Sequence, residues 1–134
     1  MDVYEYFHTR ERECRQHSLV PEADFADMFA EEDGSEGQRG IAYGRLNLTE
    51  KAFIRMFEVV VVEGSGIHRE RYSYYMVYDD QEMWGYDRDP GHKPADHGHE
   101  GPNHDRVDAG PVTFLAAVDR AWETVSAEEA LPTS

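Results

Sequence analysis

The sequence contains little cysteine and no long apolar segment, and each shortage excludes a class of protein. Cys14 is the one cysteine among 134 residues, so no disulfide can form within the chain, as is usual in a reducing cytoplasm. No apolar run approaches the roughly 20 residues of a membrane-spanning helix, and residues 1–10 do not form a signal peptide. The sequence therefore predicts a cytoplasmic protein without membrane association.

Positive charge is also scarce. The chain has 13 basic and 28 acidic residues, a formal net charge of −15, which argues against a broad basic face for duplex DNA or for anionic membranes. The acidity belongs mainly to residues 1–37 and 92–134, so the central segment is nearly neutral. Apart from Lys51 and Lys93 the basic residues are all arginine. This preference fits a coding bias or a salt-adapted surface, and it also fits bidentate contacts to oxyanions.

Common functional motifs are missing as well. There is no internal repeat, phosphate-binding glycine motif, nucleotide fingerprint or CxxC pair. Cys14 has no supporting motif around it, which favours a structural or exposed thiol over a nucleophile. A length of 134 residues with 40% hydrophobic residues predicts one domain with a single core.

The N-terminal third is predicted to be helical. Residues 2–16 suit one helix, and Pro21 suits the first turn of a second, in which Phe25, Met28 and Phe29 fall at i, i+3 and i+4. Residues 31–40 contain no apolar side chain and read as a linker. We therefore expect an acidic helical arm over residues 1–37, a single α+β domain over 38–126 and a tail over 127–134.

From residue 40 onward the pattern becomes that of strands. Four segments predict strands, with turns at residues 64–66 and 79–80 between later ones: 41–48, 51–63, 67–79 and 82–87. After Gly110 and Pro111, a helical stripe follows, formed by Phe114, Leu115, Val118, Ala121, Trp122 and Val125. The expected α+β fold is a four-stranded antiparallel meander with this C-terminal helix packed on one face.

The segment 89–105 is unusually rich in histidine. His92, His97, His99 and His104 lie within thirteen residues, interrupted by prolines and glycines that predict a loop. Three interpretations compete. The four histidines could bind zinc or another divalent metal, one or two could be a general acid and base, or the segment could be an exposed connector with a biased composition.

The acid–base interpretation suits RNA. Cleavage without a metal needs a base for the 2′-hydroxyl, an acid for the leaving oxygen and a cation for the phosphate. Arg69, Arg71 and Arg88 could supply the cation, and tyrosines such as Tyr86 could stack on bases. Against this, Arg69 and Arg71 could equally be the solvated face of an edge strand.

Two short motifs carry a family resemblance. Residues 86–92 read Tyr-Asp-Arg-Asp-Pro-Gly-His, and residues 97–99 follow as His-Gly-His before the C-terminal helix. Over about residues 41–126 the chain resembles the TumE-type toxins of toxin–antitoxin modules, in which a W-D-N-A-P-H-H turn precedes a second histidine cluster. Tyr86, Arg88 and the single His92 depart from that pattern. The resemblance implies inhibition of growth, RNA as a target and a cognate antitoxin protein as partner.

These observations assign provisional roles. His97 and His99 are the acid–base pair, His92 and Asp87 orient them, and the residues that bind substrate are Arg69, Arg71, Arg88 and Tyr86. The expected activity is ribonuclease-like and needs no cofactor. The alternative is a non-enzymatic module that binds metal through His92, His97, His99 and His104, or a protein through its acidic arm. A homodimer formed through an edge strand is a further expectation.

Overall fold

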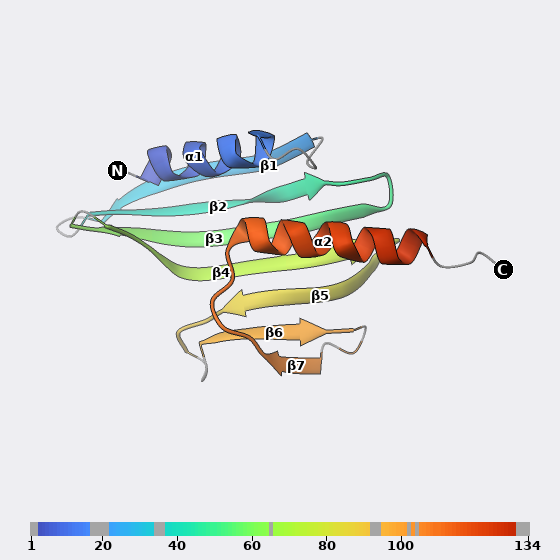
Figure 1. Ribbon diagram of the computed structural model, residues 1–134. Helices are drawn as coiled ribbons and strands as arrows, with labels where there is room; N and C mark the ends of the chain where they lie inside the picture. The colour runs from blue at the N-terminus through green and yellow to red at the C-terminus, as the bar shows by residue number, and fades with distance from the viewer. Residues whose placement is uncertain are drawn as a thin grey trace.

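The computed structural model describes residues 3–16, 22–33, 37–64, 66–91, 95–101, 103 and 105–130. Two helices and seven strands follow one another along the chain (Figure 1). The elements are α1 (Val3–Gln16), β1 (Glu22–Asp33), β2 (Gly37–Asn47), β3 (Ala52–Glu63), β4 (Gly66–Tyr78), β5 (Gln81–Arg88), β6 (Asp96–Glu100), β7 (Asp105–Asp108) and α2 (Phe114–Glu129).

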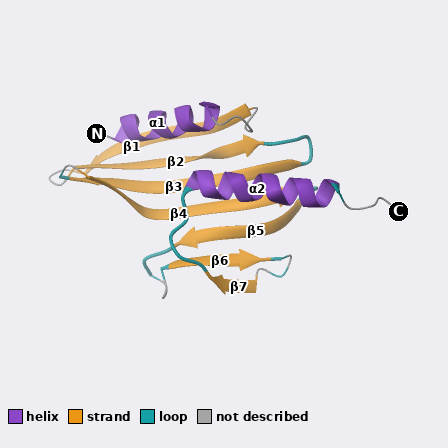
Figure 2. Cartoon of the chain, viewed as in Figure 1, coloured by secondary structure: helices purple, strands orange, loops and turns teal. Residues whose placement is uncertain are grey.

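The strands form one antiparallel sheet in which spatial order equals chain order, β1 to β7 (Figure 2). The four predicted strands are confirmed as β2 to β5, and α1 and α2 match the predicted first and last helices. At the β4–β5 hairpin, Asp79 and Asp80 both have positive φ, 50° and 65°, as a tight two-residue turn requires. The predicted count of four strands is wrong, because β1, β6 and β7 extend the sheet on both sides.

The prediction of a second N-terminal helix is also wrong. Residues 22–33 form β1, which pairs with β2 so that Phe29 lies opposite Ile41. Three apolar residues at helical spacing are too few to decide the period, and pairing with β2 gives this backbone its hydrogen bonds. Within the predicted linker 31–40, residues 31–33 and 37–40 belong to the paired strands β1 and β2. Among the described residues of the N-terminal arm, α1 is the one helix.

The histidine segment is a strand and not a loop over residues 96–100. Here β6 pairs with β5 on one side and with β7 on the other. The alternation of His97, Gly98 and His99 has the period of a strand, and the flanking prolines and glycines concealed it. His92 and His104 lie outside the described residues, so their predicted roles stay predictions.

Both helices cover the same side of the sheet, which we call the covered face (Figure 1). α1 packs on β1 and β2, and α2 packs on β3 and β4. Phe7 of α1 and five residues of α2 are buried: Phe114, Ala117, Val118, Ala121 and Val125. Thr113 caps α2 by accepting a hydrogen bond from the Ala116 amide. Neither described helix is long and apolar enough to cross a membrane.

A β-bulge in β4 changes which side chains reach each face. Val59 lies opposite Arg71, but the next residue of β3, Val60, lies opposite Arg69, so Glu70 is an extra residue in β4. Because side chains alternate along a strand, one extra residue moves all those beyond it to the other face. Arg69 therefore lies on the covered face and Arg71 on the opposite side, which we call the open face.

Candidate functional site

Two neighbouring rows of paired residues run across the open face. Residues that pair across antiparallel strands point to the same side of the sheet. The first row, from β2 to β6, is Tyr43, Phe57, Ser73, Asp87 and His97. The second row, from β2 to β7, is Arg45, Arg55, Tyr75, Gly85, His99 and Arg106. Strand pairing thus brings the two histidines next to one aspartate.

Asp87, His97 and His99 form a compact group, the Asp87 cluster. The His99 Nε2 atom lies 3.0 Å from Asp87 Oδ2, and His97 Nε2 lies 3.9 Å from the same oxygen. Ser73 Oγ donates a hydrogen bond to Asp87 Oδ1, and the Tyr75 hydroxyl donates one to Oδ2. The carboxylate is therefore held from β4 while it faces two imidazoles on β6.

The two imidazoles are close and differently exposed. Their ring centroids are 5.0 Å apart and the ring planes lie at 82°. His97 is only 5% exposed, whereas His99 is half-buried at the edge of a cavity of about 350 Å³. Arg71, Arg88 and Arg106 line the same cavity. Two groups able to exchange protons therefore share one hollow with three cations.

Gly85 makes room for Tyr75 to reach Asp87. A Cβ atom at residue 85 would lie 2.4 Å from the Tyr75 ring, so the ring lies directly over the glycine. In this position Tyr75 also stacks near His99, with centroids 6.3 Å apart. Burial, followed by the hydrogen bond to Asp87, raises the pKa of Tyr75 well above its usual value, which keeps the hydroxyl protonated as a donor.

The two exposed arginines of the cavity, Arg71 and Arg106, come from different strands. Arg71 comes from β4 and pairs with Asp89 at 3.7 Å, an exposed contact that leaves half of its side chain accessible. Arg106 comes from β7, opposite His99. A guanidinium from each side suits an anion with several oxygens, such as a phosphodiester.

The same cluster has the composition of a metal site. One ligand atom from each of Asp87, His97 and His99 lies within 4.8 Å of the others. Two imidazoles and one carboxylate suit zinc or another divalent transition metal. The cluster can therefore either exchange protons or hold a cation.

A comparison with known families decides how the chain is classified. The family model described as Toxin TumE matches residues 10–129. The chain belongs to the TumE toxin family. The match extends beyond the resemblance seen at residues 41–126, since it takes in the second half of α1 and all of β1. No curated protein and no solved structure matches the chain.

In this TumE chain, five of the predicted site residues come together at one cavity: Asp87, His97, His99, Arg71 and Arg88. The other two described ones, Arg69 and Tyr86, turn to the covered face. Arg69 donates hydrogen bonds to the Tyr74 hydroxyl and to the Val112 carbonyl. Arg88 pairs with Asp96 at 2.6 Å, and the Tyr86 hydroxyl accepts a hydrogen bond from Arg120. Their contacts tie the sheet to β6, α2 and the segment before α2.

Sequence reasoning missed Ser73, Tyr75 and Arg106. Alternation along β4 already placed Ser73 and Tyr75 on the same side as Arg71, but their proximity to Asp87 depends on the register between β4 and β5. Arg106 had no usable signal, because it lies in the segment taken for a loop. The short strands β6 and β7 bring it beside His99.

Proposed function

We propose that this TumE-family toxin cleaves RNA at the Asp87 cluster by acid–base catalysis. One observation supports this above the others: two imidazoles face a single carboxylate in a cavity lined by Arg88 and by the two exposed arginines Arg71 and Arg106. Phosphodiester cleavage needs a base, an acid and positive charge at one place. Four side chains from three strands meet that requirement.

The proposed reaction uses the RNA's own 2′-hydroxyl as nucleophile. One imidazole takes the 2′-hydroxyl proton, the 2′ oxygen bonds to the adjacent phosphorus, and the bond from phosphorus to the 5′ oxygen breaks. The second imidazole, protonated beforehand, gives its proton to that leaving oxygen. The products are a 2′,3′-cyclic phosphate and a 5′-hydroxyl, and the two imidazoles end with their protonation states exchanged. Arg71 and Arg106 neutralise the phosphate oxygens.

Asp87 is assigned a positioning role in this scheme. Its Oδ2 atom lies 3.0 Å from His99 Nε2, so it fixes the orientation of the ring. Ser73 and Tyr75 hold the carboxylate in turn by donating to it. Because the nucleophile belongs to the substrate, DNA of the same sequence is not a substrate. Membership of a toxin family implies an antitoxin that blocks this activity.

Substitution of the histidines tests the proposal. We expect His97→Ala and His99→Ala each to lower RNA cleavage by at least 100-fold, since acid–base catalysis contributes roughly 10² to 10⁴. His68→Ala, at an exposed histidine of β4, is the matched control and keeps full activity. The measurement is the cleavage rate of a defined RNA, with product ends identified by mass spectrometry. Unchanged rates in both histidine variants would remove the roles assigned to them.

A substrate with a reactive leaving group separates acid from base. A nucleoside 3′-aryl phosphodiester releases a phenolate that needs no proton. We expect the variant lacking the acid to recover activity on this ester, while the variant lacking the base stays impaired. Equal impairment of both variants on both substrates would contradict a division of roles between His97 and His99.

A metal-binding module is the alternative function, because one ligand atom from each residue of the Asp87 cluster lies within 4.8 Å of the others. Protein purified without a nickel column is assayed for metal content, cleavage and melting temperature, with and without a chelator. Near-stoichiometric metal and a lower melting temperature on chelation favour the module. Metal-free protein with unchanged cleavage and melting supports the acid–base proposal.

A further inference from the structure

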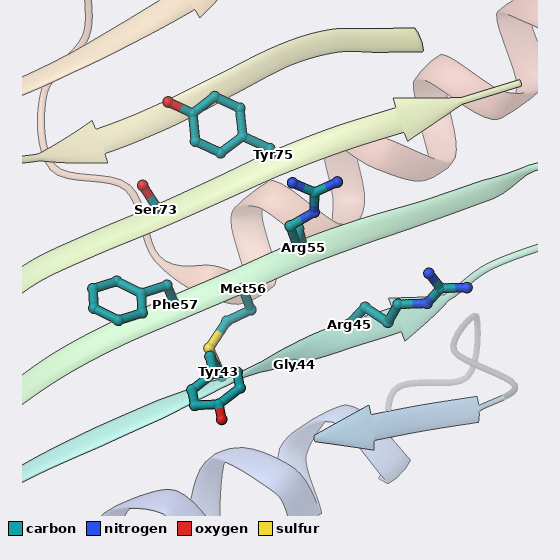
Figure 3. Close-up of a pocket in the computed structure, with 8 residues that line it drawn as sticks. All are labelled: Tyr43, Gly44, Arg45, Arg55, Met56, Phe57, Ser73 and Tyr75. Atoms are coloured by element: carbon teal, nitrogen blue, oxygen red, sulfur yellow. The ribbon is translucent and has the colours of Figure 1, made fainter. Parts of the chain in front are cut away.

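A second hollow lies on the open face beside the Asp87 cluster. Its volume is about 380 Å³, and the residues that matter here are Tyr43, Arg45, Arg55, Phe57, Ser73 and Tyr75 (Figure 3). Phe57 and Ser73 also line the cavity that contains His97 and His99. The two hollows therefore adjoin each other, and we call the second one the aromatic hollow.

Two aromatic rings are unusually exposed in the aromatic hollow. Tyr43 is 40% and Phe57 37% exposed, and they are the exposed large hydrophobic residues of the described chain. The two residues pair across β2 and β3, so their side chains are neighbours. Figure 3 shows them on the side of the sheet opposite α2. Neighbouring exposed rings offer a flat apolar surface, which is the surface that a nucleobase stacks on.

Arginines surround these rings. Arg45 and Arg55 pair across β2 and β3 in the next row, and the Arg45 guanidinium lies 4.2 Å from the centre of the Phe53 ring. With Arg71 and Arg106, arginines from four strands reach the open face of a chain whose formal net charge is −15. These four arginines are exposed, and exposed cations on one face of an acidic protein fit an anionic ligand. Flat apolar rings bordered by arginines match a nucleotide in both respects.

We infer that the aromatic hollow binds the base of an unpaired nucleotide adjacent to the phosphate held at the Asp87 cluster, so that the substrate is single-stranded RNA. This inference rests on the proposed function for the position of the phosphate. Phe57 and Asp87 lie in the same row two strands apart, about 10 Å at the usual strand spacing. A paired base is stacked within its duplex and has no free face for Tyr43 and Phe57.

Equilibrium binding tests this without depending on cleavage. The full chain is titrated into a fluorescent RNA 12-mer whose 2′-hydroxyls are methylated to block cleavage, either alone or annealed to its complement. We expect the single strand to bind at least tenfold more tightly than the duplex. Tyr43→Ala and Phe57→Ala each weaken single-strand binding at least fivefold, whereas Phe57→Tyr, which keeps a ring, binds within twofold of the unsubstituted protein. Melting curves confirm that the variants are folded.

The outcomes separate this inference from the proposed function. If binding of the single strand depends on the rings but the unmodified RNA is not cleaved, nucleotide binding in the aromatic hollow is supported and the proposed ribonuclease activity is refuted. RNA cleavage with unchanged affinity in Tyr43→Ala and Phe57→Ala overturns the hollow and leaves the ribonuclease intact. If the ring variants lose self-association or antitoxin binding but keep RNA affinity, the hollow is a protein interface and the inference is wrong. Absence of RNA binding by the unsubstituted protein overturns both.

Discussion

Each face of the sheet carries one carboxylate that accepts hydrogen bonds from two hydroxyl groups, but the other neighbours of the two carboxylates differ. On the covered face, Glu58 accepts hydrogen bonds from the Tyr6 and Tyr74 hydroxyls. On the open face, Asp87 accepts them from Ser73 and Tyr75. Glu58 is 0% exposed and lies 3.9 Å from Arg10 of α1, so its carboxylate is buried and contacts only residues that hold the fold together. Asp87 instead faces two histidines and a cavity.

The arginines differ between the faces in the same way. On the covered face Arg69 donates to Tyr74 and Val112, and Arg120 of α2 donates to Tyr86, so both arginines are fixed within the fold. On the open face Arg55 is exposed and Arg71 is half accessible. Arginine and aromatic residues thus serve packing on one side and offer a binding surface on the other. The side of the sheet that a residue occupies, more than its type, separates the two roles.

The largest difference between the two faces is expected when each carboxylate, Asp87 or Glu58, is replaced by its amide. We expect Asp87→Asn to lower RNA cleavage at least 100-fold and the free energy of unfolding by only about 1 kcal/mol. Glu58→Gln leaves the half-buried Arg10 with only the more exposed Glu13 as counter-charge, so we expect a loss of about 3 kcal/mol in unfolding free energy. Cleavage by the folded fraction should be unchanged. Denaturant titration and initial rates measure both quantities.

The opposite pattern would contradict the division between faces. If Glu58→Gln abolished cleavage in protein shown to be folded, the covered face would take part in the reaction. If Asp87→Asn unfolded the protein, Asp87 would have a mainly structural role.

Two glycines, one serving each face, give a smaller effect. In Gly85→Ala the new methyl group would clash with the Tyr75 ring and move its hydroxyl away from Asp87. We expect cleavage to fall about tenfold and unfolding free energy by roughly 2 kcal/mol. Gly98→Ala is the matched control, since its methyl group would lie 3.0 Å from Val107 Cγ2 on the covered face. It should cost stability without changing the cleavage rate, as calorimetry and rate assays would show.

The smallest expected effect is a pH dependence of the unfolding free energy that comes from Tyr72 on the covered face. Burial, the main cause, raises the pKa of Tyr72 to about 12, from about 10 for a free tyrosine. Folding therefore favours the neutral phenol, and this stabilisation is present below pH 10 and is lost as the pH rises towards 12. We expect the unfolding free energy to fall by roughly 2 kcal/mol more in the unsubstituted protein than in Tyr72→Phe over that range. Parallel pH dependences in urea denaturation would contradict it.

Alternation in the sequence was enough to predict the central sheet. From Arg71 to Tyr74 polar and aromatic residues alternate, and turn residues bound the fourth and fifth strands of the sheet, so the period and the boundaries both indicated strands. The segment from Glu22 to Asp33 failed because its few apolar residues fit either a helix or a strand, and its pairing with β2 decides between them. Tertiary pairing outweighed the local pattern there.

The site was predictable in part for a similar reason. Asp87, His97 and His99 stand out by residue type, and the structure brings them together. Arg69 and Arg71 looked equivalent because simple alternation puts both on one face, and no sequence rule located the bulge at Glu70 that separates them. The partners of Asp87 on β4 depend on register, which a single sequence does not reveal.

The order of the strands has a consequence for synthesis of the toxin. Each strand pairs only with its sequence neighbours, so the sheet can grow one hairpin at a time as the chain leaves the ribosome. A nascent chain that has reached β5 already contains Tyr43, Phe57 and Asp87, but neither histidine of the cluster. The site gains its histidines only when β6 is added, and Arg106 only when β7 follows. Under the proposed mechanism, a prematurely ended chain without β6 is therefore harmless to the cell that makes it.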